Sequence, residues 1–281
     1  MDTIDTTPRR GSGAAPSAGR EARTLTVAVV GGTGTLGRLV AAMLADAGHQ
    51  VRALSRHSDH PVDLTTGAGL AAGLSGCDVV VDASGSSGSS KVTIETLVDG
   101  SRRLLDAEAT AGVTHHVSVS IVGCELVGVA YLDAKAAQQR IVEAGPVPWS
   151  TVRATQFHDF VVTTLASATR AGLVLAPQIR VQPVSASEVA RVVARVATLP
   201  PSGAAVTVAG PEVRELRDLA RVWKRAAGRR ALVVPVVLPG RTGRALSSGA
   251  LTTDAPDVVG STTFEQWLAA PGRDGVSARS A

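Results

Sequence analysis

A tyrosine and a lysine four residues apart form the pair with the clearest catalytic potential in this chain of 281 residues. Tyr131 is the only tyrosine, and Lys135 is one of three lysines. Residues four apart share one face of a helix. A lysine ammonium beside a phenol favours the phenolate and can also bind a nicotinamide ribose. We therefore expect Tyr131 to act as acid and base on a carbonyl during hydride transfer, with Lys135 tuning it and holding the ribose. The alternative is an ordinary pair on a solvated helix surface.

Clustered glycines follow an apolar run near the N-terminus. Residues 27–30 predict a strand, and Gly32, Gly34 and Gly37 then fit the pattern G-x-G-x-x-G. In that pattern one glycine makes the tight turn, one lets the backbone approach a pyrophosphate, and one lets the helix pack on the strand. An apolar stripe follows at helical spacing and ends at Gly48. The sequence thus predicts a dinucleotide-binding strand, loop and helix, whereas an ordinary glycine turn is the alternative. The expected cofactor-binding residues are Gly31, Gly32, Thr33, Gly34, Thr35, Leu36 and Gly37.

The end of the second predicted strand, residues 49–54, indicates which dinucleotide binds. Domains that prefer NAD carry an Asp or Glu here, about 20 residues after the glycines. This chain has Ser55 and Arg56 instead, and a guanidinium suits a 2'-phosphate. We expect NADPH/NADP as the cofactor, with a solvated loop charge as the alternative role of Arg56. Asp63 and Leu64 end a short predicted third strand that could approach the adenine.

Strands and helices continue to alternate along the chain, as an α/β fold requires. We expect strands at 77–83, 116–121, 149–153, 180–184 and 205–208, helices at 91–112, 129–144, 186–198 and within 212–227, and an apolar run at 231–238. The prediction is a Rossmann-like, doubly wound parallel sheet with a small C-terminal substrate region. Its parts are a disordered tail at 1–24, an NAD(P)-binding Rossmann core at 25–172, final core elements and a substrate-binding region at 173–270, and a disordered tail at 271–281.

The amino-acid composition favours a protein that binds a small molecule over one that binds nucleic acid, a metal or a membrane. The net charge is +4 and basic residues cluster between Arg214 and Arg244, but only 2% of residues are aromatic, which leaves little for base stacking. Cys77 and Cys124 give neither a disulfide framework nor a metal site. No apolar run is long enough to cross a membrane, and residues 1–24 lack a signal-peptide core. We expect a cytoplasmic protein that binds a small molecule rather than nucleic acid or membrane, and that can form a homo-oligomer.

Several stretches resemble the atypical short-chain dehydrogenase/reductases, in particular the NmrA-like, NAD(P)H-binding group. They are residues 29–37 (VVGGTGTLG), 98–100 (VDG), 117–123 (VSVSIVG), 131–135 (YLDAK) and 148–157 (PWSTVRATQF). Over roughly residues 25–270, the resemblance implies a Rossmann fold that binds NADP(H) through Gly31 to Gly37 and Arg56. It further implies nicotinamide contacts by Ala83, Ser84, Gly85, Ala154, Thr155 and Phe157.

The resemblance also offers Ser120 as the active-site serine that follows the fifth strand. Related proteins often carry a serine one or two residues further on, where this chain has Ile121 and Val122. Ser120 is thus either a catalytic group or a structural hydroxyl at the strand end.

The expected activity is that of an NADPH-dependent oxidoreductase. It would transfer hydride to or from a carbonyl, or an activated double bond, of a small hydrophobic molecule, and a place in a biosynthetic pathway is compatible with the composition. The alternatives are a non-catalytic NADP(H)-sensing regulator and an epimerase or isomerase that retains its cofactor.

Overall fold

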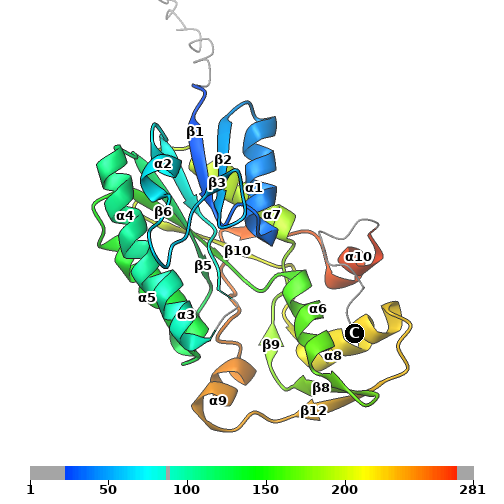
Figure 1. Ribbon diagram of the computed structural model, residues 1–281. Coiled ribbons are helices and arrows are strands. Elements are labelled where there is room, and N and C mark those ends of the chain that lie inside the picture. Colours follow the sequence, from blue (N-terminus) through cyan, green and yellow to red (C-terminus); the bar gives the residue numbers. More distant parts are fainter. Residues whose placement is uncertain (1–22, 87–88, 271–281) are drawn as a thin grey trace, which may run out of the picture.

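Eight parallel strands form the central sheet of the computed structural model, which describes residues 23–86 and 89–270 (Figure 1). The strand order is β13-β10-β6-β5-β4-β1-β2-β3. It reverses direction between β1 and β4, as in a doubly wound sheet, and ligands bind such sheets at that switch point. The predicted fold class is therefore confirmed. The strands are β1 (Thr26–Val30), β2 (Gln50–Ser55), β3 (His60–Pro61), β4 (Val79–Asp82), β5 (His115–Ile121), β6 (Trp149–Ala154), β10 (Ala205–Ala209) and β13 (Val258–Val259).

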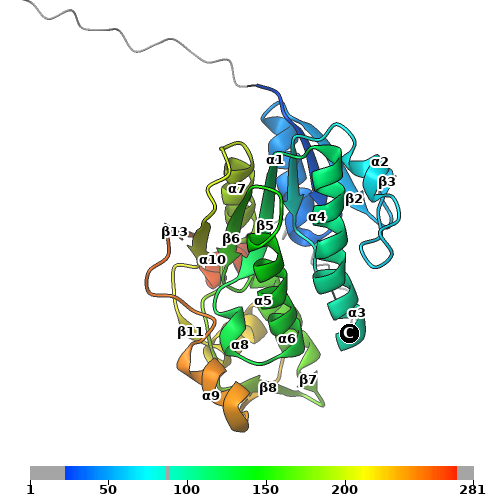
Figure 2. The same ribbon diagram turned by 90° about the vertical axis from the view of Figure 1, so that its left-hand side faces the viewer.

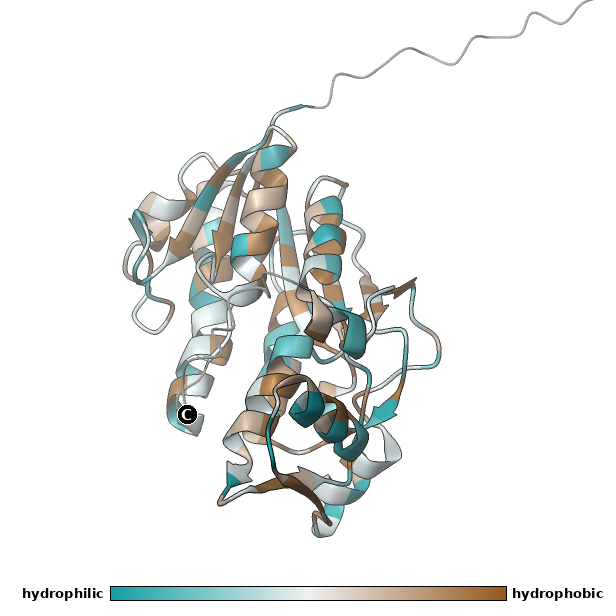
Figure 3. Cartoon of the chain, turned by 90° about the vertical axis from the view of Figure 1, so that its right-hand side faces the viewer, coloured by the Kyte–Doolittle hydropathy of each residue, from teal (hydrophilic) through white to brown (hydrophobic). Residues whose placement is uncertain are grey.

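Helices cover both faces of this sheet (Figure 2). Helices α1 (Thr35–Asp46) and α7 (Ala186–Ala197) pack on one face, and α2 (Leu70–Leu74), α4 (Gly100–Ala111) and α5 (Ala130–Glu143) on the other. In β1, Val27 and Val29 enter the first layer, whereas Ala28 and Val30 enter the second. Strands buried on both faces read as continuous apolar runs. The helices instead alternate between polar and apolar sides (Figure 3), because each buries only one stripe.

The predicted helix at 91–112 contains a wider turn. It consists of α3 (Ser90–Ile94), the π-helical segment Glu95–Asp99, and α4. The Gly100 N–H bonds to the Glu95 carbonyl five residues earlier, and a Cβ at Gly100 would lie 2.9 Å from the Leu64 Cβ. The glycine thus lets the helix approach the loop that follows β3. Such π-helical turns occur frequently at functional sites.

A smaller body lies below the carboxyl ends of the main strands (Figure 1). It holds the sheets β12-β8-β7 and β11-β9 and a separate core that includes Leu165, Leu219 and Trp223. The helix expected within 212–227 is α8, which buries its apolar stripe there. Helix α7 and strands β10 and β13 return to the main sheet. The elements of the smaller body are α6 (His158–Ser167), β7 (Thr169–Arg170), β8 (Leu173–Pro177), β9 (Arg180–Val181), β11 (Arg214–Glu215), α8 (Leu216–Ala226), β12 (Leu232–Val236), α9 (Gly240–Ser248) and α10 (Phe264–Ala269).

Several boundaries differ from those predicted. The third strand ends at Pro61 rather than Leu64, because Asp63 Oδ1 accepts hydrogen bonds from the Thr65 N–H and hydroxyl and closes a turn. The strand expected at 180–184 stops at Val181, shortly before Pro183, which has no N–H for a ladder. The sequence patterns did not predict α2, α6, β7, β8, α9, β13 and α10. The expected tails at 1–24 and 271–281 lie almost wholly outside the described residues. Within the described ranges, the helices are too short or too polar to span a bilayer.

The buried His158 ring links α6 to the C-terminal segment and predicts an acid-sensitive fold. It lies 5.5 Å from the Trp267 ring, and its Nε2 donates to the Thr262 carbonyl. Burial lowers the pKa of His158 to about 4, so the unfolded chain takes up the proton first as the pH falls below about 6.5. Folding stability should therefore fall between about pH 6.5 and 4, by up to about 3 kcal/mol for this group.

Denaturant unfolding measured across this pH range checks the prediction. In His158→Phe, part of the acid-dependent loss should vanish, while His115, whose pKa burial also lowers to about 4, retains its share. An unchanged pH profile in His158→Phe would contradict the assignment.

Candidate active site

The glycine loop after β1 turns at Gly31. Its φ is +72°, a left-handed conformation that favours glycine. The tight turn therefore lies at Gly31, directly before the glycines of the G-x-G-x-x-G pattern. The N–H groups of Gly31 and Gly32 both donate to the Leu54 carbonyl, at 2.9 and 3.2 Å. A Cβ at Gly37 would overlap the Gly31 carbonyl. Loop, helix and neighbouring strand are thus in backbone contact.

The first turn of α1 presents backbone donors that suit a dinucleotide phosphate. Gly34 occupies the N-cap position, and within the described chain no side chain caps this end. The first N–H groups of a helix have no carbonyl partner inside it, and here they belong to Thr35, Leu36 and Gly37. Near the missing Cβ of Gly34, only the Gly31 carbonyl lies within 4 Å, at 3.2 Å. An uncapped, open and glycine-lined helix start fits a pyrophosphate.

The segment after β4 joins this loop to the predicted catalytic tyrosine. The Ala83 N–H donates to the Val30 carbonyl at 3.0 Å, and a Cβ at Gly31 would lie 2.7 Å from the Ala83 carbonyl oxygen. Two residues further on, a Cβ at Gly85 would lie 3.8 Å from the Tyr131 hydroxyl. Ala83, Ser84 and Gly85 therefore lie between the glycine loop and the half-buried phenol.

Lys135 lies one helical turn after Tyr131 and is only 4% exposed. Its Nζ donates to Gln138 Oε1 at 2.6 Å. Burial lowers the pKa of the Lys135 ammonium, and the nearby carboxylate of Asp82 opposes this effect. The ammonium is therefore tied to groups on α5 and β4.

The expected effect of Lys135 on the phenol is not seen in this arrangement. Burial raises the pKa of Tyr131, with no opposing contribution from Lys135. The ammonium donates to Gln138 here, and an effect of Lys135 on the phenol stays a prediction. Tyr131 is thus a protonated phenol at neutral pH, which suits a proton donor.

The Ser120 hydroxyl is buried beside a thiol. The residue is 2% exposed, and its Oγ lies 4.0 Å from Cys124 Sγ. Burial raises the pKa of Cys124, and the nearby Lys135 opposes this rise with a smaller effect. Ser120, Cys124 and Lys135 thus share one corner at the end of β5.

The predicted residues after β6 lie at the same edge of the sheet. The Ala154 carbonyl accepts from the Val122 N–H just beyond β5. Thr155 Oγ1 accepts from the Gly210 N–H, so this hydroxyl fixes the loop after β10. Phe157 is half-buried and packs against the core beside α7.

The residues expected at the adenosine end lie beside β2. Arg56 is exposed and Ser55 is half-buried, its Oγ accepting from the His57 N–H. Hydrogen bonds from Thr65 lower the pKa of Asp63, and Arg56 adds a smaller effect. Leu64 is buried in the core under α4.

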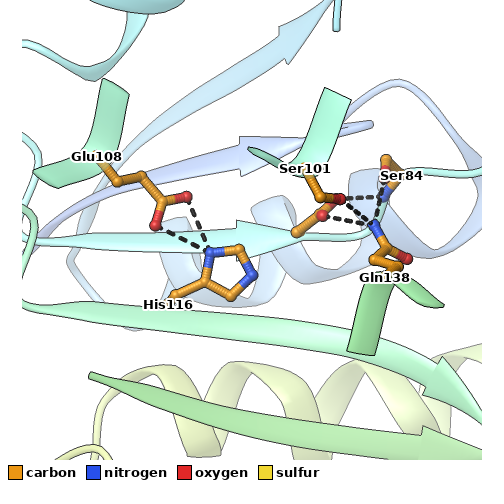
Figure 4. Close-up of polar contacts among 6 residues, drawn as sticks. Ser84, Ser101, Glu108, His116 and Gln138 are labelled. Atoms are coloured by element: carbon orange, nitrogen blue, oxygen red, sulfur yellow. Dashed lines mark hydrogen bonds and ion pairs between the residues drawn. The ribbon is translucent and has the colours of Figure 1, made fainter. Parts of the chain in front are cut away.

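Sequence reasoning missed the polar residues behind Lys135. Gln138 Nε2 donates to Asp82 Oδ2 at 2.9 Å and to Ser101 Oγ at 3.0 Å, and it lies 3.4 Å from Ser84 Oγ. Figure 4 shows the Gln138 amide between the two serines, apart from the buried pair of Glu108 and His116. A carboxylate that ends the apolar run at 79–82 could have indicated this cluster.

The fold and this edge define a Rossmann protein for a nicotinamide dinucleotide. The sequence profile of the NAD(P)H-binding family matches residues 31–200, and the chain belongs to that family. The NAD(P)H-binding part of the predicted resemblance is thereby confirmed.

Similar proteins include reductases and epimerases. The (4-alkanoyl-5-oxo-2,5-dihydrofuran-3-yl)methyl phosphate reductase of Streptomyces griseus is 30% identical over 212 residues, which cover 72% of this chain and 74% of that protein. A nucleoside-diphosphate-sugar epimerase from Staphylococcus aureus matches with a TM-score of 0.71 and 16% identity, over 87% of this chain and 99% of the other. An NADPH-dependent quinone oxidoreductase from Escherichia coli, complexed with NADPH, gives a TM-score of 0.67 and 16% identity, over 86% and 98%. The two structures show a shared fold, and the reductase relative supports an enzyme.

Two glycine substitutions should separate packing from binding. Gly37→Ala places a methyl group against the Gly31 carbonyl and should cost roughly 1 to 3 kcal/mol of folding stability. Gly34→Ala suits the backbone, since its φ is −75°, and its Cβ would lie 3.2 Å from the Gly31 carbonyl oxygen, a much milder contact than at Gly37, but its methyl group would face the bound phosphates. We expect Gly34→Ala to keep its thermal midpoint and lose nucleotide affinity. Scanning calorimetry and fluorescence titration measure the two effects, and unchanged affinity in Gly34→Ala would argue against a phosphate site here.

Proposed function

We propose that the protein is an NADPH-dependent reductase of a carbonyl, or of a double bond conjugated to one, in a small hydrophobic molecule. The observation that carries this proposal is the convergence at one sheet edge. Three features lie next to one another there: the uncapped start of α1, the segment from Ala83 to Gly85, and the Tyr131 hydroxyl beside Gly85. A cofactor and a proton donor placed in this way serve hydride transfer.

Each residue has a chemical task in this proposal. NADPH, when bound, supplies the hydride to the electrophilic carbon. The Tyr131 hydroxyl donates its proton to the oxygen that gains the electron pair, and solvent restores that proton. Lys135 holds the ribose from its buried position, and Ser120 orients the substrate oxygen if substrate reaches the end of β5. In the opposite direction the Tyr131 hydroxyl would first lose its proton to solvent, and the phenolate would then remove the proton from an alcohol.

The preference for NADPH rests on the end of β2. Ser55 and the exposed Arg56 stand where a carboxylate would select NAD. The family and the neighbours with bound cofactors support a nicotinamide dinucleotide. The preference for the 2'-phosphate is our proposal.

The reductase relative suggests a substrate class to test. Its name specifies a five-membered unsaturated lactone that carries an alkanoyl chain and a phosphate ester. We propose an unsaturated lactone or ketone with an apolar chain, with and without a phosphate group, as the first compounds for assay.

Tyr131→Phe tests catalysis. It removes the proton donor and keeps the ring, so the thermal midpoint and NADPH affinity should survive while turnover falls roughly a hundredfold or more. The measurement is NADPH oxidation with the compounds above. Full activity in Tyr131→Phe would sink the proposed mechanism. A protein that binds NADPH, oxidises it with none of these compounds and binds a partner protein in response to the NADPH/NADP ratio would instead be a sensor.

Arg56→Glu tests cofactor choice. Losing one charge-assisted contact should weaken NADPH binding by about 1.5 to 3 kcal/mol and leave NADH binding almost unchanged. Arg191→Glu is the matched control, because Arg191 is an exposed arginine on α7. Equal affinity of the unmodified protein for NADPH and NADH in isothermal titration would refute the preference.

A further inference from the structure

A chain of hydrogen bonds connects Lys135 to a buried carboxylate. Lys135 Nζ donates to Gln138 Oε1 at 2.6 Å, and Gln138 Nε2 donates to Asp82 Oδ2 at 2.9 Å. Lys135, Gln138 and Asp82 are 4%, 1% and 0% exposed. Lys135 and Gln138 stand three residues apart, so they share the face of α5 that meets the sheet. An ammonium and a carboxylate, both removed from solvent, are thus joined through one amide.

The contacts fix the orientation of that amide. Its oxygen must face Lys135, because an ammonium only donates, and its NH2 group must face Asp82, because a carboxylate only accepts. Ser101 Oγ accepts from the same NH2 group at 3.0 Å and donates to the Leu97 carbonyl at 2.8 Å within the π-helical segment. Gln138 therefore has one stable orientation.

Charge explains why the amide matters. An isolated buried ammonium is costly and tends to lose its proton. The charged or ionisable groups near Lys135 are Asp82 from β4, which favours the ammonium, and Cys124 after β5. Asp82 acts on Lys135 through the Gln138 dipole, whose negative end points at Nζ. Removing either partner would leave the ammonium poorly compensated.

Asp82 also shapes the opposite wall of the site. Its Oδ1 accepts from the Ser84 N–H at 2.9 Å, and Ser84 precedes Gly85, the residue beside the Tyr131 hydroxyl. One carboxylate thus fixes both the segment that faces the phenol and, through Gln138, the lysine behind it.

We propose that Gln138 is a positioning residue: with Asp82 behind it, its amide holds the Lys135 side chain in place and keeps it charged at the cofactor site. The consequence for NADPH rests on the ribose-binding role of Lys135 in the proposed function. The positioning of Lys135 by Gln138 does not depend on that role.

Lysine NMR tests this directly, because the chain has only three lysines. With ¹³Cε-labelled lysine and no added nucleotide, each resonance is titrated with pH, and Lys135→Met assigns the buried one. In Gln138→Met, which keeps the length of the side chain, the Lys135 midpoint should fall by about one pH unit or more. Asp82→Asn nearly preserves the shape of the side chain and should also lower the Lys135 midpoint. This variant provides the test if Gln138→Met folds poorly.

Gln139→Met is the matched control. Gln139 is the next residue on α5, is also buried, and bonds to Glu143 and Arg153 instead. Gln139→Met should lower the thermal midpoint about as much as Gln138→Met does, and it should leave the Lys135 titration unchanged. A Lys135 midpoint that stays at its original value in both Gln138→Met and Asp82→Asn overturns the proposal, as does an equal shift in Gln139→Met.

NADPH titration of the same proteins separates this inference from the proposed function. We expect Gln138→Met to weaken NADPH binding roughly tenfold, as one lost hydrogen bond would, and Gln139→Met to leave it unchanged. If the lysine midpoint shifts while neither Gln138→Met nor Lys135→Met weakens NADPH, positioning by Gln138 is supported and the ribose role of Lys135 fails.

Discussion

The close approach of two backbones, at Gly31 after β1 and at Ala83 after β4, determines where the other site residues lie. The two strands are neighbours in the sheet, and the chain order reverses between them. A side chain at Gly31 would press on the Ala83 carbonyl, and one at Gly37 on the Gly31 carbonyl. The glycines therefore let α1 begin against the sheet with its free N–H groups at the strand ends. Gly85 follows Ala83 by two residues, and a Cβ at Gly85 would lie 3.8 Å from the Tyr131 hydroxyl.

Burial is the second constraint on this site. Tyr131 and Lys135 occupy α5, which packs on the sheet, so the phenol stays protonated and the ammonium needs a counter-charge. Asp82 supplies that charge from the last position of an otherwise apolar strand. Buried opposite charges give little net stability, and here the Gln138 amide that joins them fixes the directions of the side chains beside the candidate site.

Local patterns were enough to predict the main fold. The apolar strands, the glycine loop and the stripes of α1, α5, α7 and α8 each follow from residues within one element. They could not predict the smaller body, where β8 pairs with β12 across more than fifty residues and α6 carries a weakly amphipathic sequence. The sequence could not show which of the adjacent glycines makes the tight turn, because that depends on the backbone angle. The role of Gln138 could not be predicted because it depends on Asp82, which is distant in the sequence and adjacent only in the folded protein.

Transfer of deuterium from NADPH labelled at the nicotinamide C4 tests the central claim most directly. Each face of C4 is labelled in a separate sample, and the reduced product of an unsaturated lactone or ketone is analysed by mass spectrometry. Our account predicts that one of the two labelled samples yields a product with one deuterium on carbon, since a nicotinamide bound in one orientation would present one face of C4 to the substrate. NADPH that binds and remains unoxidised with every compound, or a product without deuterium from both samples, would contradict it.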